Sequence, residues 1–92
     1  MLDIVLSNRF KRDLKLAQKR GFDLSLLNEV VDILASENPL PAKFRDHELI
    51  GNYIGFRECH LKPDWLLIYK VETDNLVLML FRTGTHSDLF SK

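Results

Sequence analysis

The first twenty residues change from a strand pattern to a helical pattern of apolar positions. Leu2, Ile4 and Leu6 alternate with other residues, which is typical of a short strand. Ser7 or Asn8 can then cap a helix, because their side chains accept hydrogen bonds from free backbone N–H groups. The apolar face of this helix consists of Phe10, Leu14 and Ala17, and Gly21 stops it. The pattern predicts a strand followed by a helix whose opposite face is basic.

The next segment predicts a second helix with clearer boundaries. Asp23 or Ser25 can cap its start, and Pro39 and Pro41 prevent it from continuing beyond Asn38. Its apolar stripe consists of Leu27, Val30, Val31 and Leu34. We expect this stripe to belong to the hydrophobic core.

Three strand-like runs occupy the second half of the chain, at residues 53–61, 65–73 and 76–83. The joints Lys62-Pro63-Asp64 and Asp74-Asn75 are turn sequences. Joints this short produce an antiparallel meander, in which residue 61 would face residue 65 and residue 72 would face residue 76. The second and third runs are apolar on both faces, so helices or loops must cover both sides. The predicted fold is α+β, with two N-terminal helices packed on a small antiparallel sheet.

Length and composition favour one domain, residues 1–92. A chain of 92 residues with 46% hydrophobic content can bury one modest core. Cys59 is the single cysteine, so no intramolecular disulfide can form and a reducing compartment is expected. No apolar run has the length of a signal-peptide core or a membrane span. We therefore expect a soluble cytoplasmic protein.

Basic residues gather near the N-terminus although the formal net charge is zero. Residues 1–22 hold six basic and two acidic residues, whereas residues 23–41 hold four acidic residues and no basic one. The first helix therefore offers one basic surface, which includes Lys15 and Lys19. A solvated helix face is the simplest interpretation, and contact with the phosphates of a nucleic acid is the alternative.

The predicted meander brings reactive side chains from separate strands to one edge of the sheet. His60 would lie beside Leu66, and Leu66 beside Arg82, so His60 and Arg82 would share one face with their backbones about 10 Å apart. His86 would follow at the same end, next to the turn that holds Asp64. Taken singly, each residue has an ordinary interpretation as a structural histidine, a turn residue or a surface ion-pair partner. Gathered together, they predict a catalytic site.

Imidazole, carboxylate and guanidinium groups suit the cleavage of RNA without a metal ion. The 2′-hydroxyl of RNA attacks the adjacent phosphate when a base removes its proton and an acid protonates the leaving 5′-oxygen. Histidine titrates nearest to neutral pH, and the arginine fork fits a charged phosphate. DNA lacks the 2′-hydroxyl and would not be a substrate.

Three longer strings carry a resemblance to a known family: DHELIG at residues 46–51, HLKPDWLLIYK at residues 60–70 and RTGTH at residues 82–86. Together with residues 16–20 and 39–41, they resemble toxins of the YafQ type in the RelE superfamily, over nearly the whole chain. The resemblance implies a RelE-like fold and ribosome-dependent cutting of messenger RNA in the decoding site, the A site, of the 70S ribosome. It also implies inhibition by a cognate antitoxin resembling DinJ, in a toxin–antitoxin hetero-oligomer.

The resemblance further implies a role for each catalytic residue, with no cofactor and no metal. His47, His60 and Asp64 would form the base side of the site. His86 would be the general acid, and Arg82 would stabilise the charged phosphate in the transition state. How the acid and base duties divide among these groups is left open.

Four further residues are expected to contact the substrate or the ribosome. Phe90 would position the RNA by stacking, unless it only anchors the C-terminus to the core. Trp65 would support the site or contact RNA, unless it is a core aromatic. Lys15 and Lys19 would meet ribosomal RNA. Tyr53 stands where we expect tryptophan and Cys59 where a small residue is familiar, which bears on fine substrate contacts rather than on chemistry.

Three alternatives come from other classes of protein. A non-enzymatic toxin resembling ParE would act by binding a protein target, although such a module has no need for this titratable cluster. A zinc site could combine three histidines, His47, His60 and His86, with Cys59 or Asp64, but no short ligand pair supports it. Cys59 is a weaker candidate nucleophile, because no neighbour would obviously lower its pKa. Codon preference and the identity of the antitoxin are not visible in the sequence.

Overall fold

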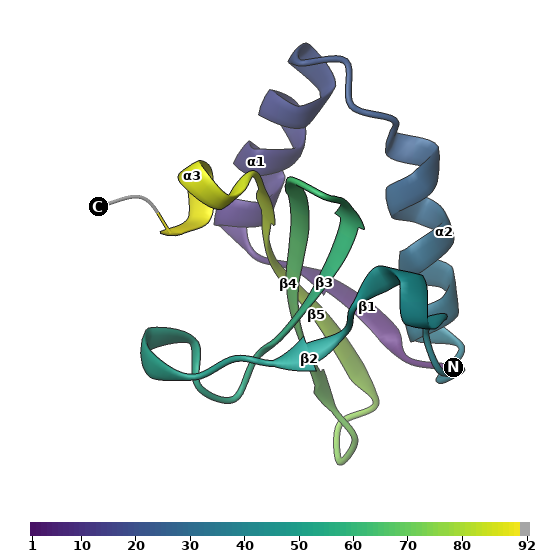
Figure 1. The fold of residues 1–92 in the computed structure, drawn as a ribbon. Helices are drawn as coiled ribbons and strands as arrows, with labels where there is room; N and C mark the ends of the chain where they lie inside the picture. The colour runs from purple at the N-terminus through teal and green to yellow at the C-terminus, as the bar shows by residue number, and fades with distance from the viewer. Residues whose placement is uncertain (91–92) are drawn as a thin grey trace.

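A five-stranded sheet with the strand order β1-β5-β4-β3-β2 forms the centre of the structure, a computed structural model that describes residues 1–90 (Figure 1). The strands are β1 (Asp3–Leu6), β2 (His47–Glu48), β3 (Arg57–Lys62), β4 (Trp65–Glu72) and β5 (Val77–Gly84). The helices are α1 (Asn8–Lys19), α2 (Leu24–Ala35) and α3 (His86–Phe90), with short 3-10 turns η1 (Ala42–Phe44) and η2 (Gly51–Tyr53). The predicted α+β class is confirmed.

Both long helices begin as their sequences predict. The Ser7 side chain accepts a hydrogen bond from the Phe10 N–H, and the Asp23 side chain accepts one from the Ser25 N–H. α2 ends at Ala35, before Pro39. These local caps place α1 and α2 where they cover the sheet (Figure 1). Within residues 1–90, no helix is long and apolar enough to cross a membrane.

Two apolar clusters lie on opposite faces of the sheet, as the apolar strands require. The larger cluster joins α1 and α2 to β4 and β5, and includes Phe10, Val30, Leu67 and Leu78. The smaller cluster contains Leu66, Ile68 and Leu89 and packs against the loop around η2. The loop and α3 thus cover the face that the long helices leave open (Figure 1).

The pairing of β1 and the start of β3 differ from expectation. β1 pairs with β5 in parallel, so the sheet is mixed rather than wholly antiparallel. β3 begins at Arg57, although the first of the three strand-like runs was expected to begin at residue 53. Gly51 and Gly55 have φ values of +71° and +93°, a conformation that favours a turn over a strand and explains the later start.

The register of the meander contains two irregularities that move Arg82. His60 faces Leu66 as expected, but a bulge after His60 places Lys62, rather than residue 61, opposite Trp65. In the second hairpin Glu72 faces residue 77, and a shift beside Ile68 leaves Leu66 opposite Gly84 and Ile68 opposite Arg82. The bulge after His60 leaves the pairing of His60 unchanged. The one-residue offset at Glu72 and the one-residue shift beside Ile68 together displace Arg82 by two residues. Arg82 therefore keeps its predicted face but lies two residues from its predicted level.

Candidate active site

A buried carboxylate joins two of the histidines on the face of the sheet beneath α3. β2 pairs His47 with Glu58, and His60 follows Glu58 by two residues on the same side of β3. Glu58 Oε1 lies 3.1 Å from His47 Nε2 and 3.2 Å from His60 Nε2. Glu58 is buried, at 5% exposure. Sequence reasoning missed Glu58, and its only signal was the two-residue spacing from His60.

The third histidine is held by the carboxylate of the β3–β4 turn. Asp64 Oδ1 accepts from the backbone N–H of His86 at 2.8 Å, and His86 Nδ1 lies 2.6 Å from the same oxygen. The backbone donor and then the imidazole lower the pKa of Asp64, so this exposed carboxyl stays ionised at neutral pH. The predicted neighbourhood of Asp64 and His86 is present. Asp64 contacts His86, however, and not the histidines of the expected base side.

The three imidazoles form a row with His60 in the middle. Its ring lies 6.3 Å from the ring of His47 and 5.8 Å from the ring of His86, between centroids. The row draws on β2 and β3, which are consecutive strands, and on α3, which follows two strands later. It places His60, Asp64 and His86 together with His47 and Glu58, and these are titratable groups that suit proton transfer.

The short helix α3 is held in place by the carboxylate of Asp88, two residues after His86. Asp88 exchanges hydrogen bonds with Thr85, since its Oδ2 accepts from the Thr85 N–H and its own N–H donates to Thr85 Oγ1. Arg20, at the end of α1, donates to Asp88 at 2.6 Å. The Arg20 guanidinium lowers the pKa of Asp88 to about 2. A Cβ at Gly84 would come within 2.9 Å of Asp88 Oδ2, so this close packing leaves no room for a larger residue.

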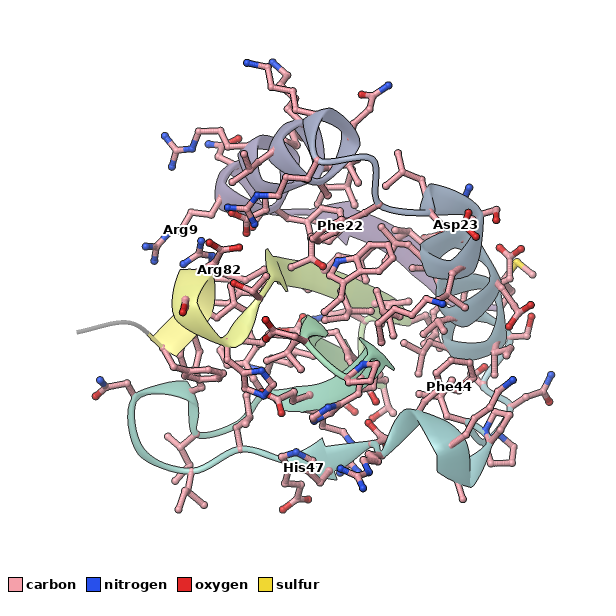
Figure 2. The ribbon with its side chains drawn as sticks, turned by 45° about the horizontal axis from the view of Figure 1, so that its top comes forward. Arg9, Phe22, Asp23, Phe44, His47 and Arg82 are labelled. Carbon is pink, nitrogen blue, oxygen red and sulfur yellow. The ribbon has the colours of Figure 1, made fainter. Side chains whose placement is uncertain are left out.

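Arg82 stands apart from the histidine row and is paired with Asp13 of α1. Its Nε and Nη2 lie 3.0 Å and 2.9 Å from the two carboxylate oxygens, and Asp13 also accepts from the Thr83 N–H. Asp13 is the main cause that raises the pKa of Arg82. Within the described part of the chain, no hydrogen bond or ion pair joins Arg82 to a histidine. In Figure 2 Arg82 lies towards α1 and His47 towards the opposite edge. The expectation that Arg82 lies level with His60 is wrong, because of the two register shifts.

Trp65 lies in the core, so the expectation that it contacts RNA is wrong. It is 3% exposed, and its ring packs 5.0 Å from the ring of Phe22. Its Nε1–H donates to Thr83 Oγ1 at 2.9 Å, and this hydroxyl donates to the Leu66 carbonyl. Trp65 is therefore a core residue: its ring is packed, its indole N–H has a hydrogen-bond partner, and this hydrogen bond links β4 to β5.

The other expected contact residues face solvent. Phe90 is 41% exposed and meets the ring of Tyr53 edge-on at 5.6 Å, so part of its face is available for stacking. Lys15 and Lys19 are exposed on α1. Their positions are compatible with contact to a large partner.

Comparison with known proteins then decides the family. A family model described as "Bacterial toxin of type II toxin-antitoxin system, YafQ" matches residues 2–91. The chain belongs to the YafQ toxin family. It is 47% identical over 89 residues to the mRNA interferase toxin YafQ of Escherichia coli K12, covering 96% of this chain and 95% of that protein. The proposed resemblance is thereby confirmed.

Solved structures of YafQ-type toxins share the fold. A metal-bound toxin from Helicobacter pylori superposes with a TM-score of 0.92 at 52% identity, covering 98% of this chain and 100% of that one. YafQ in the E. coli DinJ–YafQ complex gives a TM-score of 0.89 at 44% identity, covering 98% and 99%. The three chains therefore share one arrangement of helices and strands.

The geometry of this YafQ-type toxin excludes a metal or nucleophile role for its cysteine. Cys59 is fully buried in the larger core, and burial raises the pKa of its thiol to about 12. Cys59 therefore cannot share a zinc ion with His60, which faces the other side of β3. A different trio, His47, Glu58 and His60, has its ligand atoms within 4.8 Å of one another. Two imidazoles and one carboxylate could hold a divalent transition metal.

Proposed function

We propose that this toxin is an mRNA interferase, an endoribonuclease that cuts messenger RNA in the ribosomal A site by metal-independent acid–base catalysis. The observation that carries the proposal is the row of three imidazoles bound to two carboxylates on one face of the sheet. The name of the E. coli relative, an mRNA interferase, supports an enzyme over a ParE-like toxin that only binds protein.

In the proposed reaction the ribose 2′-hydroxyl attacks the adjacent phosphorus. A P–O bond to the 2′-oxygen forms, the P–O bond to the 5′-oxygen breaks, and a cyclic 2′,3′-phosphate remains. The His47–Glu58–His60 cluster takes the 2′-hydroxyl proton, and His86 gives a proton to the leaving 5′-oxygen. We assign Asp64 to His86 rather than to the base side. Because a carboxylate only accepts, it keeps the proton on Nδ1 and leaves Nε2 to face the substrate.

Arg82 is proposed to stabilise the charged phosphate while it remains bound to Asp13. Asp13 binds the Nε and Nη2 donors, so an approaching phosphoryl oxygen would be met by the Nη1 donors, on a guanidinium that also has Tyr53 as a neighbour. The bidentate pair orients the guanidinium plane at the edge of β5. Arg82 would then reach the RNA next to the imidazole row rather than within it.

Membership of the YafQ family also suggests which proteins and particles this toxin binds. The E. coli relative has been solved in a DinJ–YafQ complex. We propose that a DinJ-like antitoxin binds this chain in a hetero-oligomer, and that the toxin acts on 70S ribosomes in the cytoplasm. A metal ion in the His47–Glu58–His60 trio would occupy the imidazole lone pairs, so we expect it to inhibit rather than assist.

The proposal is tested by comparing RNA cleavage with and without translating 70S ribosomes, mapped by primer extension. We expect cuts in frame within A-site codons and little cutting of free RNA, because the ribosome holds the substrate in the reactive geometry. A chelator selective for transition metals, added at constant Mg²⁺, should leave the rate unchanged. Loss of cleavage on chelation would refute metal independence, and equally fast cutting of free RNA would refute ribosome dependence.

Lys15 and Lys19 are proposed to contact ribosomal RNA from the exposed face of α1. Replacing both by glutamate should weaken ribosome binding and reduce its dependence on salt, because fewer counterions are released from phosphate. Sedimentation of the toxin with ribosomes at several salt concentrations measures this. Lys43→Glu, an exposed reversal on η1, is the control. If the double variant binds like the control, α1 is not the ribosomal surface.

A further inference from the structure

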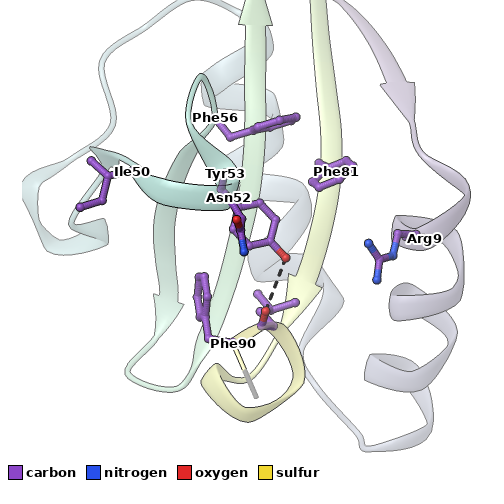
Figure 3. A pocket seen from close by; sticks show the side chains of 8 residues that line it. Arg9, Ile50, Asn52, Tyr53, Phe56, Phe81 and Phe90 are labelled. Carbon is purple, nitrogen blue, oxygen red and sulfur yellow. Dashed lines mark hydrogen bonds between the residues drawn. The ribbon is translucent and has the colours of Figure 1, made fainter. Parts of the chain in front are cut away.

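An aromatic pocket opens beside the catalytic face, between α1, η2 and α3 (Figure 3). Its volume is about 590 Å³, and no step of the proposed reaction uses it. Arg9 lines it from α1, Asn52 and Tyr53 from η2, Phe81 from β5 and Phe90 from α3. Phe56 also lines it, so the pocket combines four rings with one permanent cation and one amide.

The rings of the pocket present an apolar lining that suits a flat π-system. Tyr53 meets Phe81 at 6.1 Å and Phe90 at 5.6 Å between centroids, both edge to face. Phe56, which directly precedes β3, stacks on Phe81 at 4.6 Å between centroids. The Tyr53 hydroxyl donates to the Leu89 carbonyl and so ties η2 to α3. A nucleobase entering between such rings would gain stacking without needing a particular sequence.

The polar groups at the rim match the remaining parts of a nucleotide. Asn52 is exposed and carries both a donor and an acceptor, which is what the edge of a base requires. Arg9 is also exposed, and its guanidinium fits a phosphate. Figure 3 shows Arg9 on the far side of the pocket from Asn52. A base and its phosphate could thus be bound at once.

The helix α3 connects the pocket to the imidazole row. His86 begins this helix and Phe90 ends it, so about 6 Å along the helix axis separate the general acid from the pocket wall. Leu66, which pairs with His60, packs in the same apolar cluster as Leu89 of the pocket wall. One RNA strand lying across this face would meet both sites in neighbouring nucleotides.

We propose that the Arg9–Asn52–Tyr53 pocket binds one nucleobase of the RNA next to the scissile phosphate and contributes to nucleotide preference. This inference rests on the proposed nuclease function. Tyr53 and Phe90 supply the stacking surface, Asn52 contacts the edge of the base, and Arg9 binds the phosphate. An apolar segment of an antitoxin is the competing occupant, and the experiment separates the two.

The experiment compares pairs of variants with the same chemical change. Asn52→Ala and Arg9→Ala alter the pocket, whereas Asn28→Ala on α2 and Arg12→Ala on α1 remove the same groups from exposed positions outside it. Cleavage of one messenger RNA on ribosomes is mapped at every codon. We expect Asn52→Ala to flatten the nucleotide preference beside the cut, and Arg9→Ala to lower cleavage on the order of 10-fold relative to Arg12→Ala.

A direct titration keeps this test independent of the cleavage assay. Each of the four ribonucleoside monophosphates is added to the toxin while the Asn52 side-chain amide is followed by NMR. A shift in the wild type that Arg9→Ala weakens supports the pocket even if the toxin cuts no RNA. Wild-type cleavage with unchanged preference in Asn52→Ala, or the absence of any shift, overturns the pocket and leaves the nuclease proposal standing. Weaker antitoxin binding with unaltered cleavage also overturns it.

Discussion

Replacing His86 by alanine lowers mRNA cleavage on the ribosome by about 10²- to 10⁴-fold, the usual contribution of a positioned proton donor. His86 is the imidazole that Asp64 holds by its Nδ1, so in the proposed reaction Nε2 would be the nitrogen that meets the leaving oxygen. Its side chain is 52% exposed, so its removal costs little packing. The loss of activity should therefore occur without a comparable loss of stability. Primer extension on a messenger RNA bound to 70S ribosomes measures the rate.

Two controls separate the general acid from a structural role of His86. Thermal unfolding and antitoxin binding of His86→Ala should match the wild type. Asp64→Asn should retain a hydrogen bond to His86 but remove the ionised acceptor, so we expect a smaller loss than for His86→Ala and a changed pH dependence of the rate. If His86→Ala keeps a tenth or more of the wild-type rate, another group must protonate the 5′-oxygen.

Replacing Trp65 by alanine lowers the free energy of unfolding by about 3 to 5 kcal/mol, the range for a large aromatic removed from a core. The change leaves a cavity beside Phe22 and leaves Thr83 without the indole donor. Because small domains are stable by only about 5 to 15 kcal/mol, much of the stability would be lost. Urea denaturation followed by circular dichroism measures the effect.

Phe90→Ala is the matched control, because Phe90 is also aromatic but 41% exposed. It should cost far less stability than Trp65→Ala while still affecting cleavage. Trp65→Phe should keep most of the packing and lose about 1 kcal/mol with the hydrogen bond to Thr83. Unchanged stability in Trp65→Ala, with reduced RNA cleavage, would instead indicate a substrate contact.

Local sequence signals predicted the helices and the first hairpin well. The cap residues Ser7 and Asp23 mark the two helix starts, and Pro39 marks where the second cannot continue. A turn is equally local, so His60 was correctly paired with Leu66. In each case the decisive interaction joins residues a few positions apart, and one sequence is enough to see it.

Contacts between distant segments were not predictable in the same way. β1 pairs with β5 across more than seventy residues, and Asp13 binds Arg82 across sixty-nine. Arg82 is displaced along β5 by the one-residue offset at Glu72 and by the further shift beside Ile68, and neither follows from the turn sequence alone. Glu58 looks like an ordinary solvent-facing residue until β2 places His47 opposite it. A single sequence contains no signal that pairs such residues.

The ion pair between Arg20 and Asp88 links two segments with different proposed duties. Arg20 caps the C-terminal end of α1, the helix proposed to contact the ribosome. Asp88 lies in α3, the single helical turn that carries His86. The pair therefore connects the end of α1 directly to the helix that carries His86. If α1 contacts the ribosome and His86 donates the proton, as proposed, docking would also steady the proton donor, and an inhibitor that separates α1 from α3 would lower activity without contacting the histidines.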